Sequence, residues 1–288
     1  IKEYKSKMSS NFRRTKILAT LGPATDAPGV LAQIIEAGVN VVRLNFSHGT
    51  PEQHAARVAK VREISASIGR EVGILADLQG PKIRIEKFAA DKVMLQAGKD
   101  FRLVCRADAP AGDETQVAVS YLGLVNDVHV GDTLLLDDGL ISLKVKALDG
   151  DVIVTEILAG GALSNRKGLN RLGGGLSLDA LSEQDKEHIA IAAKLDVDFL
   201  AVSFCRSAAD IELARAIAKS HGSFAHIVAK IERAEAIVNL VEITEASDVV
   251  MVARGDLGVE IGDAELPGLQ KLIIRTALEC NKVVITAT

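Results

Sequence analysis

The sequence predicts an α/β fold in which helices cover a parallel β sheet. Apolar residues make up 48% of the chain and are mostly Ala, Val, Ile and Leu, whereas aromatic residues make up 3%. Short apolar runs such as KILATL, VVRLNF and VGILADL alternate with helical patterns. Nearly continuous apolar strands indicate burial on both faces, and their alternation with helices indicates parallel pairing.

Three strands with this character open the chain. They are predicted within residues 15–21, 40–46 and 72–78, where β-branched and leucine residues are concentrated. Helical periodicity follows the first two, over residues 27–37 and 52–68. This order predicts the first part of a barrel domain.

Residues 83–172 have a different pattern, with closely spaced strands joined by turns. The Asp-Gly pairs in LLLDDGLISLKVKAL and LDGD favour tight hairpins, and a Gly-rich stretch over residues 160–177 ends the region. We therefore predict an antiparallel β-barrel lid domain inserted after strand 3. It separates a first part of the barrel domain, residues 8–82, from a second part, residues 173–288.

The β/α alternation resumes after the insert, where Ser182 to Asp185 offers a Ser-x-x-Asp helix start that resembles a capping box. Strands are predicted at residues 199–204, 226–231, 248–253 and 282–287, which brings the number of parallel strands to seven. A (β/α)8 TIM-type barrel needs eight. The chain is therefore expected to be a fragment of a longer protein, truncated before the eighth strand.

Composition argues against several classes of protein. The formal net charge is -4 and no basic run is present, so nucleic acid is not an expected partner. Cys105, Cys205 and Cys280 have no CxxC spacing, which favours a reducing cytoplasm over a disulfide framework or a zinc site. No apolar run has the length of a membrane span. Residues 1–7 precede a Met-Ser-Ser sequence and are expected to be vector-derived.

Polar residues at the end of the second strand form the first candidate site. Reacting groups in a parallel barrel come from the carboxyl ends of its strands. Arg43, Asn45 and Ser47 alternate along one face of this strand. The guanidinium of Arg43 matches a phosphate or a carboxylate ligand, and the less favoured alternative is that Arg43 only pairs with a carboxylate at the barrel rim.

Two later strands add opposite charges. Lys230 and Glu232 share a face of an otherwise apolar strand, where burial is costly unless the charges are used or paired. After the next strand, Gly255 precedes Asp256 in the sequence RGDLG, which predicts a loop with N–H groups available to an anion, or merely a tight turn. Glu232 and Asp256 supply hard oxygen ligands suited to Mg2+. Arg84 and Lys167 add cations near the hinges of the insert, where surface solvation would also explain them.

Seven motifs together resemble the pyruvate kinase family in order and spacing. They are TKILATLGPAT, VNVVRLNFSHG, ILADLQGPKIR, NRKGLNRLGGG, IVAKIE, MVARGDLGVEI and VVITAT, which span about residues 15–288. The resemblance implies a glycolytic phosphotransferase that converts phosphoenolpyruvate and ADP to pyruvate and ATP through an enolate. It also implies Mg2+ or Mn2+ as the cofactor.

The resemblance further implies a role for each matching residue. Arg43 and Lys230 would contact the transferred phosphoryl group, and Glu232 and Asp256 would hold the divalent ion. The other implied positions are Gly255, Asp256 and Thr288 for the pyruvate part, with Thr288 also a candidate in enolate protonation, and Asn45, His48, Arg84 and Lys167 for the nucleotide phosphates.

One departure from the family pattern concerns potassium. Family members that require K+ form a monovalent-cation site near the positions of Asn45, Ser47, Asp77 and Leu78, with Thr usual at position 78 and Glu at position 82. This chain has Leu78 and Lys82 instead. An ammonium group on a flexible stem can place a fixed positive charge at the ion's position, so K+ is expected to be dispensable. The alternative is that Lys82 extends into solvent.

The family usually continues with an eighth strand and a C-terminal regulatory domain that contributes to a homotetramer. Both lie beyond this sequence.

Two other functions remain open at this level. One is a metal-dependent oxo-acid aldolase or lyase barrel, which would not explain the inserted β domain. The other is a catalytically silent fragment that binds metal and anions.

Overall fold

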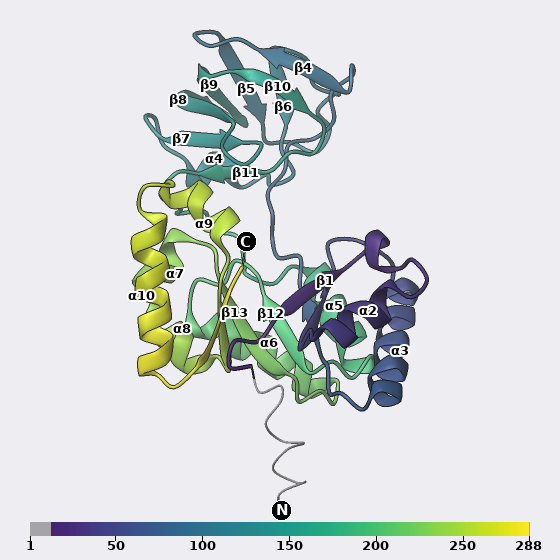
Figure 1. The fold of residues 1–288 in the computed structure, drawn as a ribbon. Coiled ribbons are helices and arrows are strands. Elements are labelled where there is room, and N and C mark those ends of the chain that lie inside the picture. The colour runs from purple at the N-terminus through teal and green to yellow at the C-terminus, as the bar shows by residue number, and fades with distance from the viewer. Residues whose placement is uncertain (1–12, 288) are drawn as a thin grey trace, which may run out of the picture. The chain divides into compact units, whose positions relative to one another are not determined.

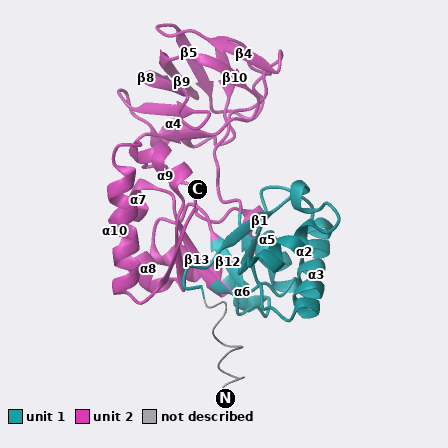
Figure 2. Cartoon of the chain, in the orientation of Figure 1, with its two compact units in different colours: residues 1–78, 187–201, 217–226 teal, residues 79–186, 202–216, 227–288 magenta. Residues whose placement is uncertain are grey.

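The computed structural model describes residues 13–287 and contains two compact units (Figures 1 and 2). Unit 1 comprises residues 1–78, 187–201 and 217–226, and unit 2 comprises residues 79–186, 202–216 and 227–288. The expected vector-derived residues 1–7 and the candidate Thr288 lie outside the described residues.

Unit 1 is built on parallel strands with helices between them. Strand order is β1, β2, β3, β12, from Leu18–Leu21, Val41–Asn45, Gly73–Asp77 and Phe199–Val202. The helical elements are η1 (Pro23–Thr25), α2 (Val30–Ala37), α3 (Pro51–Ile68) and α5 (Glu183–Lys194). Helix α3 starts with a capping box, because Thr50 Oγ1 accepts the Gln53 N–H at 3.3 Å and Gln53 Oε1 accepts the Thr50 N–H at 3.0 Å.

Unit 2 contains a second set of parallel strands, β13 (His226–Ile231), β14 (Val249–Val252) and β15 (Val283–Thr286), paired in that order. The accompanying helices are α6 (Ala208–Ser220), α7 (Ala234–Val238), α8 (Leu240–Ala246), α9 (Arg254–Ile261) and α10 (Leu266–Glu279). All four residues of β14 are buried, as expected of a strand covered on both faces. The described residues of the two units thus contain all seven predicted parallel strands.

The remainder of unit 2 is β-rich. Its strands are β4 (Lys92–Leu95), β5 (Asp100–Val104), β6 (Gln116–Ala118), β7 (Thr133–Leu136), β8 (Ile141–Asp149), β9 (Val152–Ala159), β10 (Gly161–Ser164) and β11 (Leu169–Arg171), with the short helix α4 (Leu124–Asp127). They form a six-stranded sheet in the order β11-β7-β8-β9-β5-β6 and a two-stranded sheet of β10 and β4. Alternate residues such as Phe101, Leu103 and Leu143 are fully buried in its core.

One strand pair in this region differs from the antiparallel prediction. Strand β6 pairs parallel with β5, whereas the other pairs are antiparallel. The chain between them, residues 105–115, is long enough to return to the starting end of β5, whereas a tight turn would force antiparallel pairing.

The predicted hairpins are present. Asp137, Asp138 and Gly139 join β7 to β8 with φ values of 53°, 53° and 87°. Such left-handed conformations are tolerated best by Gly, Asn and Asp, which explains the Asp-Asp-Gly sequence at this turn.

The chain around Gly80, which leads from β3 to the β-rich region, is held by the residues that cap the start of helix α5. Ser182 and Asp185 form the expected reciprocal contacts at the start of α5, with the Asp185 N–H donating to Ser182 Oγ at 3.1 Å and the Ser182 N–H donating to Asp185 Oδ2 at 3.0 Å. Asp185 also accepts the Gly80 N–H at 3.0 Å, and it is fully buried. A single carboxylate therefore caps a helix and fixes the chain before the β-rich region.

Two further observations concern the described residues as a whole. None of the helices in residues 13–287 is long and apolar enough to cross a bilayer. The three cysteines are free thiols, with Cys105 and Cys205 buried.

Candidate active site

Arg43 on β2 is bonded to both neighbouring strands of unit 1. Its Nε donates to Asp77 Oδ2 on β3 at 2.6 Å, and its Nη1 donates to Thr20 Oγ1 on β1 at 3.0 Å. Thr20 and Arg43 are register partners, so the strand pairing itself places these groups together. The ion pair considered as an alternative is therefore present. A guanidinium has five donors, so this pair orients Arg43 without excluding a phosphate contact.

Other predicted residues lie beside Arg43 in unit 1. Asn45 is the register partner of Asp77, and its Oδ1 accepts the Ser47 N–H at 3.1 Å. His48 follows on an exposed turn and donates its N–H to the Asn45 carbonyl at 3.2 Å. Leu78 is buried at 2% exposure.

In unit 2, Lys230 and Glu232 form a buried ion pair at the end of β13. Lys230 Nζ lies 2.8 Å from Glu232 Oε1 and donates to Ser203 Oγ at 2.7 Å. Glu232 Oε2 accepts the Phe204 N–H at 2.8 Å, and only 1% of the Glu232 side chain is exposed. Phe204 has φ 55°, which is rare for a bulky residue. Backbone strain of this kind is often found at functional sites.

The loop predicted around Gly255 and Asp256 is helical instead. Helix α9 starts at Arg254, so both residues lie in its first turn. Tertiary contacts here override the low helix propensity of Gly. The N-cap, Ala253, provides no side-chain hydrogen bond, so the N–H groups of the first turn remain suited to an anionic ligand.

Asp256 faces a cavity of about 590 Å³ within unit 2. Its Oδ1 lies 3.0 Å from Lys82 Nζ, which is also 3.8 Å from Asp138 Oδ1. Arg254, Gly255 and Asp263 also line this cavity. The Lys82 side chain is 25% exposed and bridges two carboxylates, so it does not extend into solvent.

Lys167 and Arg84 are bonded within the β-rich region. Lys167 Nζ lies 2.7 Å from Asp137 Oδ1, and Arg84 Nη1 donates to the Arg166 carbonyl at 3.0 Å. Neither residue lines the cavity at Asp256, and Lys230 and Glu232 do not line it either. The structure therefore brings Lys82, Gly255 and Asp256 together, whereas the convergence of Glu232 and Asp256 on one ion stays a prediction.

The two candidate metal ligands have suitable chemistry for Mg2+. Each is a carboxylate with an ammonium within hydrogen-bonding distance, Lys230 at Glu232 and Lys82 at Asp256. The negative charge of each carboxylate thus already attracts a positively charged group. No group of three or more His, Cys, Asp or Glu side chains suited to a metal occurs among residues 13–287. Mg2+ usually needs only one or two protein carboxylates and completes its shell with water or substrate oxygens.

Comparison with known proteins identifies the family. The family model described as "Pyruvate kinase, barrel domain" matches residues 12–288. This chain belongs to the pyruvate kinase family. It is 55% identical over 284 residues to pyruvate kinase II of Salmonella typhimurium and 54% identical over 286 residues to pyruvate kinase of Haemophilus influenzae. These alignments cover 98% of this chain and 59% of each relative. Pyruvate kinase of Geobacillus stearothermophilus is 44% identical over 279 residues, covering 96% of this chain and 47% of that relative.

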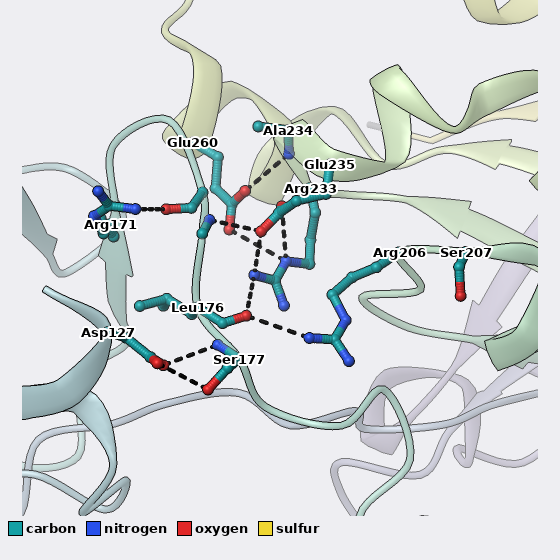
Figure 3. Close-up of polar contacts among 12 residues, drawn as sticks. Asp127, Arg171, Leu176, Ser177, Arg206, Ser207, Arg233, Ala234, Glu235 and Glu260 are labelled. Atoms are coloured by element: carbon teal, nitrogen blue, oxygen red, sulfur yellow. Dashed lines mark hydrogen bonds and ion pairs between the residues drawn. The ribbon is translucent and has the colours of Figure 1, made fainter.

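A second charged cluster in this chain was not predicted from sequence. It consists of Arg233, Glu235 and Glu260 (Figure 3). Arg233 directly follows Glu232, and Glu260 lies one helical turn after Asp256. The available signal was a charged residue directly after one candidate ligand and another one helical turn after the second. Arg233 and Glu235 contact each other locally, but their bonds to Leu176 and Gly175 cross about 60 residues of sequence, which no local pattern reveals.

Glu260 is the most perturbed carboxyl of this cluster. It is 3% exposed, and burial raises its pKa to about 7. The Ala234 N–H, which donates to Glu260 Oε2 at 3.0 Å, and the positive charge of Arg233 limit this rise in pKa. Glu260 therefore takes up a proton near neutral pH, well above the range of an ordinary carboxyl.

We expect Glu260 to make the stability of the protein depend on pH. Between about pH 4.5 and 7 the folded state keeps this proton while the unfolded chain loses it, so the free energy of unfolding falls as pH rises. Glu260→Gln removes this contribution. The stability of wild type relative to Glu260→Gln should fall by roughly 2–3 kcal/mol across this range, as measured by urea unfolding.

The matched control is the exposed Glu279→Gln on α10. Its stability relative to wild type should change little with pH. A constant difference between wild type and Glu260→Gln from pH 4.5 to 7 would contradict the raised pKa.

Proposed function

We propose that this chain is the catalytic barrel region of a pyruvate kinase that transfers a phosphoryl group between phosphoenolpyruvate and ADP. The observation that carries the proposal is the pairing of both candidate ligands with lysines, Glu232 with Lys230 and Asp256 with Lys82, at the ends of neighbouring β/α units. The family match supports the same reaction and does not favour an aldolase or lyase. A catalytically silent fragment remains an outcome of the activity test below.

In the proposed reaction, the bond between phosphorus and the enol oxygen of phosphoenolpyruvate breaks, and a terminal phosphate oxygen of ADP forms the new bond. The enolate left behind then takes a proton at its terminal carbon. Glu232 and Asp256 would hold Mg2+ or Mn2+, which supplies positive charge to the substrate oxygens when bound. Arg43 and Lys230 would neutralise charge on the transferred group, which is the main requirement of phosphoryl transfer.

The remaining residues would position the substrates. Gly255 and Asp256, with their N–H groups in the first turn of α9, would face the pyruvate carboxylate. Thr288 is proposed beside it. The proposed contacts to nucleotide phosphates come from Asn45, His48, Arg84 and Lys167. The last two belong to the β-rich region, whose closure would exclude water.

The finer architecture is part of this proposal. A (β/α)8 barrel would consist of residues 8–82 and 173–288, with residues 83–172 inserted as a lid domain. The observed β-rich sheets and the seven parallel strands support this arrangement. Because the chain spans 59% of the length of the first two relatives, an eighth strand, a C-terminal domain and a homotetramer are proposed for the intact protein. A cytoplasmic location is proposed from the absence of a disulfide cysteine pattern.

Glu232→Gln should lower kcat by at least about 100-fold, because it removes one charged ligand from a metal site with only two carboxylates. The measurement is a coupled assay of ADP-dependent pyruvate formation in the intact protein, with circular dichroism to verify folding. Glu242→Gln is the matched control, since Glu242 also accepts a backbone N–H, from Ala208 at 3.3 Å. Equal activities of the two variants would contradict the metal role, and an inactive wild type would contradict the function.

The same assay tests whether potassium is needed. With tetramethylammonium as the counter-cation, wild type should keep most of its turnover, because the Lys82 ammonium would supply the fixed positive charge that K+ supplies in other family members. Lys82→Glu should lose turnover and regain it when K+ is added. Near-zero wild-type activity restored by K+ would refute the replacement of the ion by Lys82.

A further inference from the structure

The chain returns from the β-rich region through residues 171–178, here named the return segment. Three successive glycines in it, Gly173, Gly174 and Gly175, have φ values of 85°, 75° and 86°. Residues that carry a side chain rarely adopt this left-handed backbone conformation. The glycines therefore permit a sharp turn of the backbone along a specific path. Figure 3 shows this path beside the Arg233 cluster.

Backbone groups of the return segment are bonded to the elements that carry both candidate metal ligands. The Gly173 N–H donates to the Glu260 carbonyl on α9 at 2.9 Å. The Gly175 N–H donates to Glu235 Oε1 at 2.6 Å, and Arg233 Nη2 donates to the Leu176 carbonyl at 3.0 Å. Helix α9 contains Asp256, and Arg233 directly follows Glu232.

Arg233 is the centre of these contacts. Its side chain is 5% exposed, and its Nη2 also donates to Glu235 Oε1 at 2.8 Å. The Nε donates to Glu235 Oε2 at 3.2 Å and lies 4.0 Å from Glu260 Oε1. A buried guanidinium is costly unless its donors are bonded, and here a carboxylate and a carbonyl bond it in defined directions. Arg233 therefore fixes the return segment more strictly than apolar packing would.

The close approach of Glu235 supports the same conclusion. A Cβ at Gly174 would lie 2.7 Å from Glu235 Oε2 and 2.9 Å from its Cδ, which is closer than real contacts allow. The carboxylate therefore lies directly against the glycine backbone. Any displacement of the return segment must disturb the bonds of Arg233 and Glu235.

The return segment is also bonded to residues of the β-rich region. Arg171 Nε donates to Asp132 Oδ2 at 2.9 Å, and its Nη1 donates to the Gly174 carbonyl at 2.6 Å. The Ser177 N–H donates to Asp127 Oδ2 at 2.8 Å. The return segment is thus held on one side by the β-rich region and on the other by α7, with its N-cap Arg233, and by α9.

We propose that Arg233 is a positioning residue, which latches the return segment to α7 and α9 so that the carboxylates of Glu232 and Asp256 keep their relative geometry when the β-rich region closes. This inference rests on the proposed phosphoryl transfer. In the proposed reaction other residues contact the substrates, and Arg233 acts through the backbone of the return segment.

The test compares Arg233→Lys with wild type in the intact protein. Lysine keeps the charge but cannot bond Leu176 and Glu235 in the same fork. Without substrates, hydrogen exchange of the Gly173, Gly175 and Ser177 amides should become at least about 10-fold faster, because the segment opens more easily. In the coupled assay kcat should fall by about 10-fold, with KM for phosphoenolpyruvate changed by less than about twofold, since misplacement mainly affects the transition state.

Arg215→Lys is the matched control. Arg215 also donates to a carboxylate and a carbonyl, Asp248 at 2.9 Å and Ala246 at 2.6 Å, but these lie at the end of α8 and beyond it. Arg215→Lys should leave the amide hydrogen exchange of the return segment and kcat nearly unchanged. Equal effects of Arg233→Lys and Arg215→Lys, or unchanged exchange in Arg233→Lys, would overturn the proposal.

Glu235→Gln decides the matter if Arg233→Lys fails to fold, because it keeps the side-chain size while weakening the bonds to Gly175 and Arg233. Faster exchange of the Gly175 amide together with a lower kcat supports the latch, and wild-type behaviour overturns it. An inactive wild type would instead refute the proposed function, so the two failures are distinguishable.

Discussion

The burial of Lys230 and Glu232 at the end of β13 is the constraint around which the described site in unit 2 is organised. Two charges in an otherwise apolar strand require partners, and here they bond each other, Ser203 and the Phe204 N–H. The left-handed conformation of Phe204 directs that N–H to Glu232. Local strain in the backbone after β12 is thereby offset by a charge-assisted hydrogen bond.

The chain that leads toward the β-rich region passes close to Ser203 and Phe204, the partners of this ion pair. A Cβ at Gly80 would lie 2.7 Å from the Phe204 ring and 2.8 Å from Ser203 Cβ. A glycine with φ 69° is therefore needed where the outgoing chain passes the partners of the ion pair. The return segment has glycines for a similar reason, because Gly174 lies against Glu235. The outgoing connection thus passes beside the uncharged partners of the Lys230–Glu232 ion pair, and the return connection passes beside the charged Glu235.

Much of the fold could be predicted from local sequence patterns. The seven parallel strands, the Asp-Asp-Gly hairpin and the Ser182–Asp185 cap depend on periodicity or on neighbouring residues, and the structure confirms them. The helical start at Arg254 could not be read in this way, because glycines there suggested a loop. The partners of Lys82 and Arg233 were also missed. Lys82 bonds Asp256 and Arg233 bonds Leu176 across 174 and 57 residues of sequence, and such pairings follow only from the folded chain.

The central claim is that Glu232 and Asp256 hold one divalent ion next to Lys230. Anomalous diffraction from crystals of the intact protein with Mn2+ and phosphoenolpyruvate tests it most directly. The account predicts a single Mn2+ peak about 2.1 Å from a carboxylate oxygen of each residue, with Lys82 displaced from Asp256. Separate peaks at the two carboxylates, or a single peak that contacts neither, would contradict it.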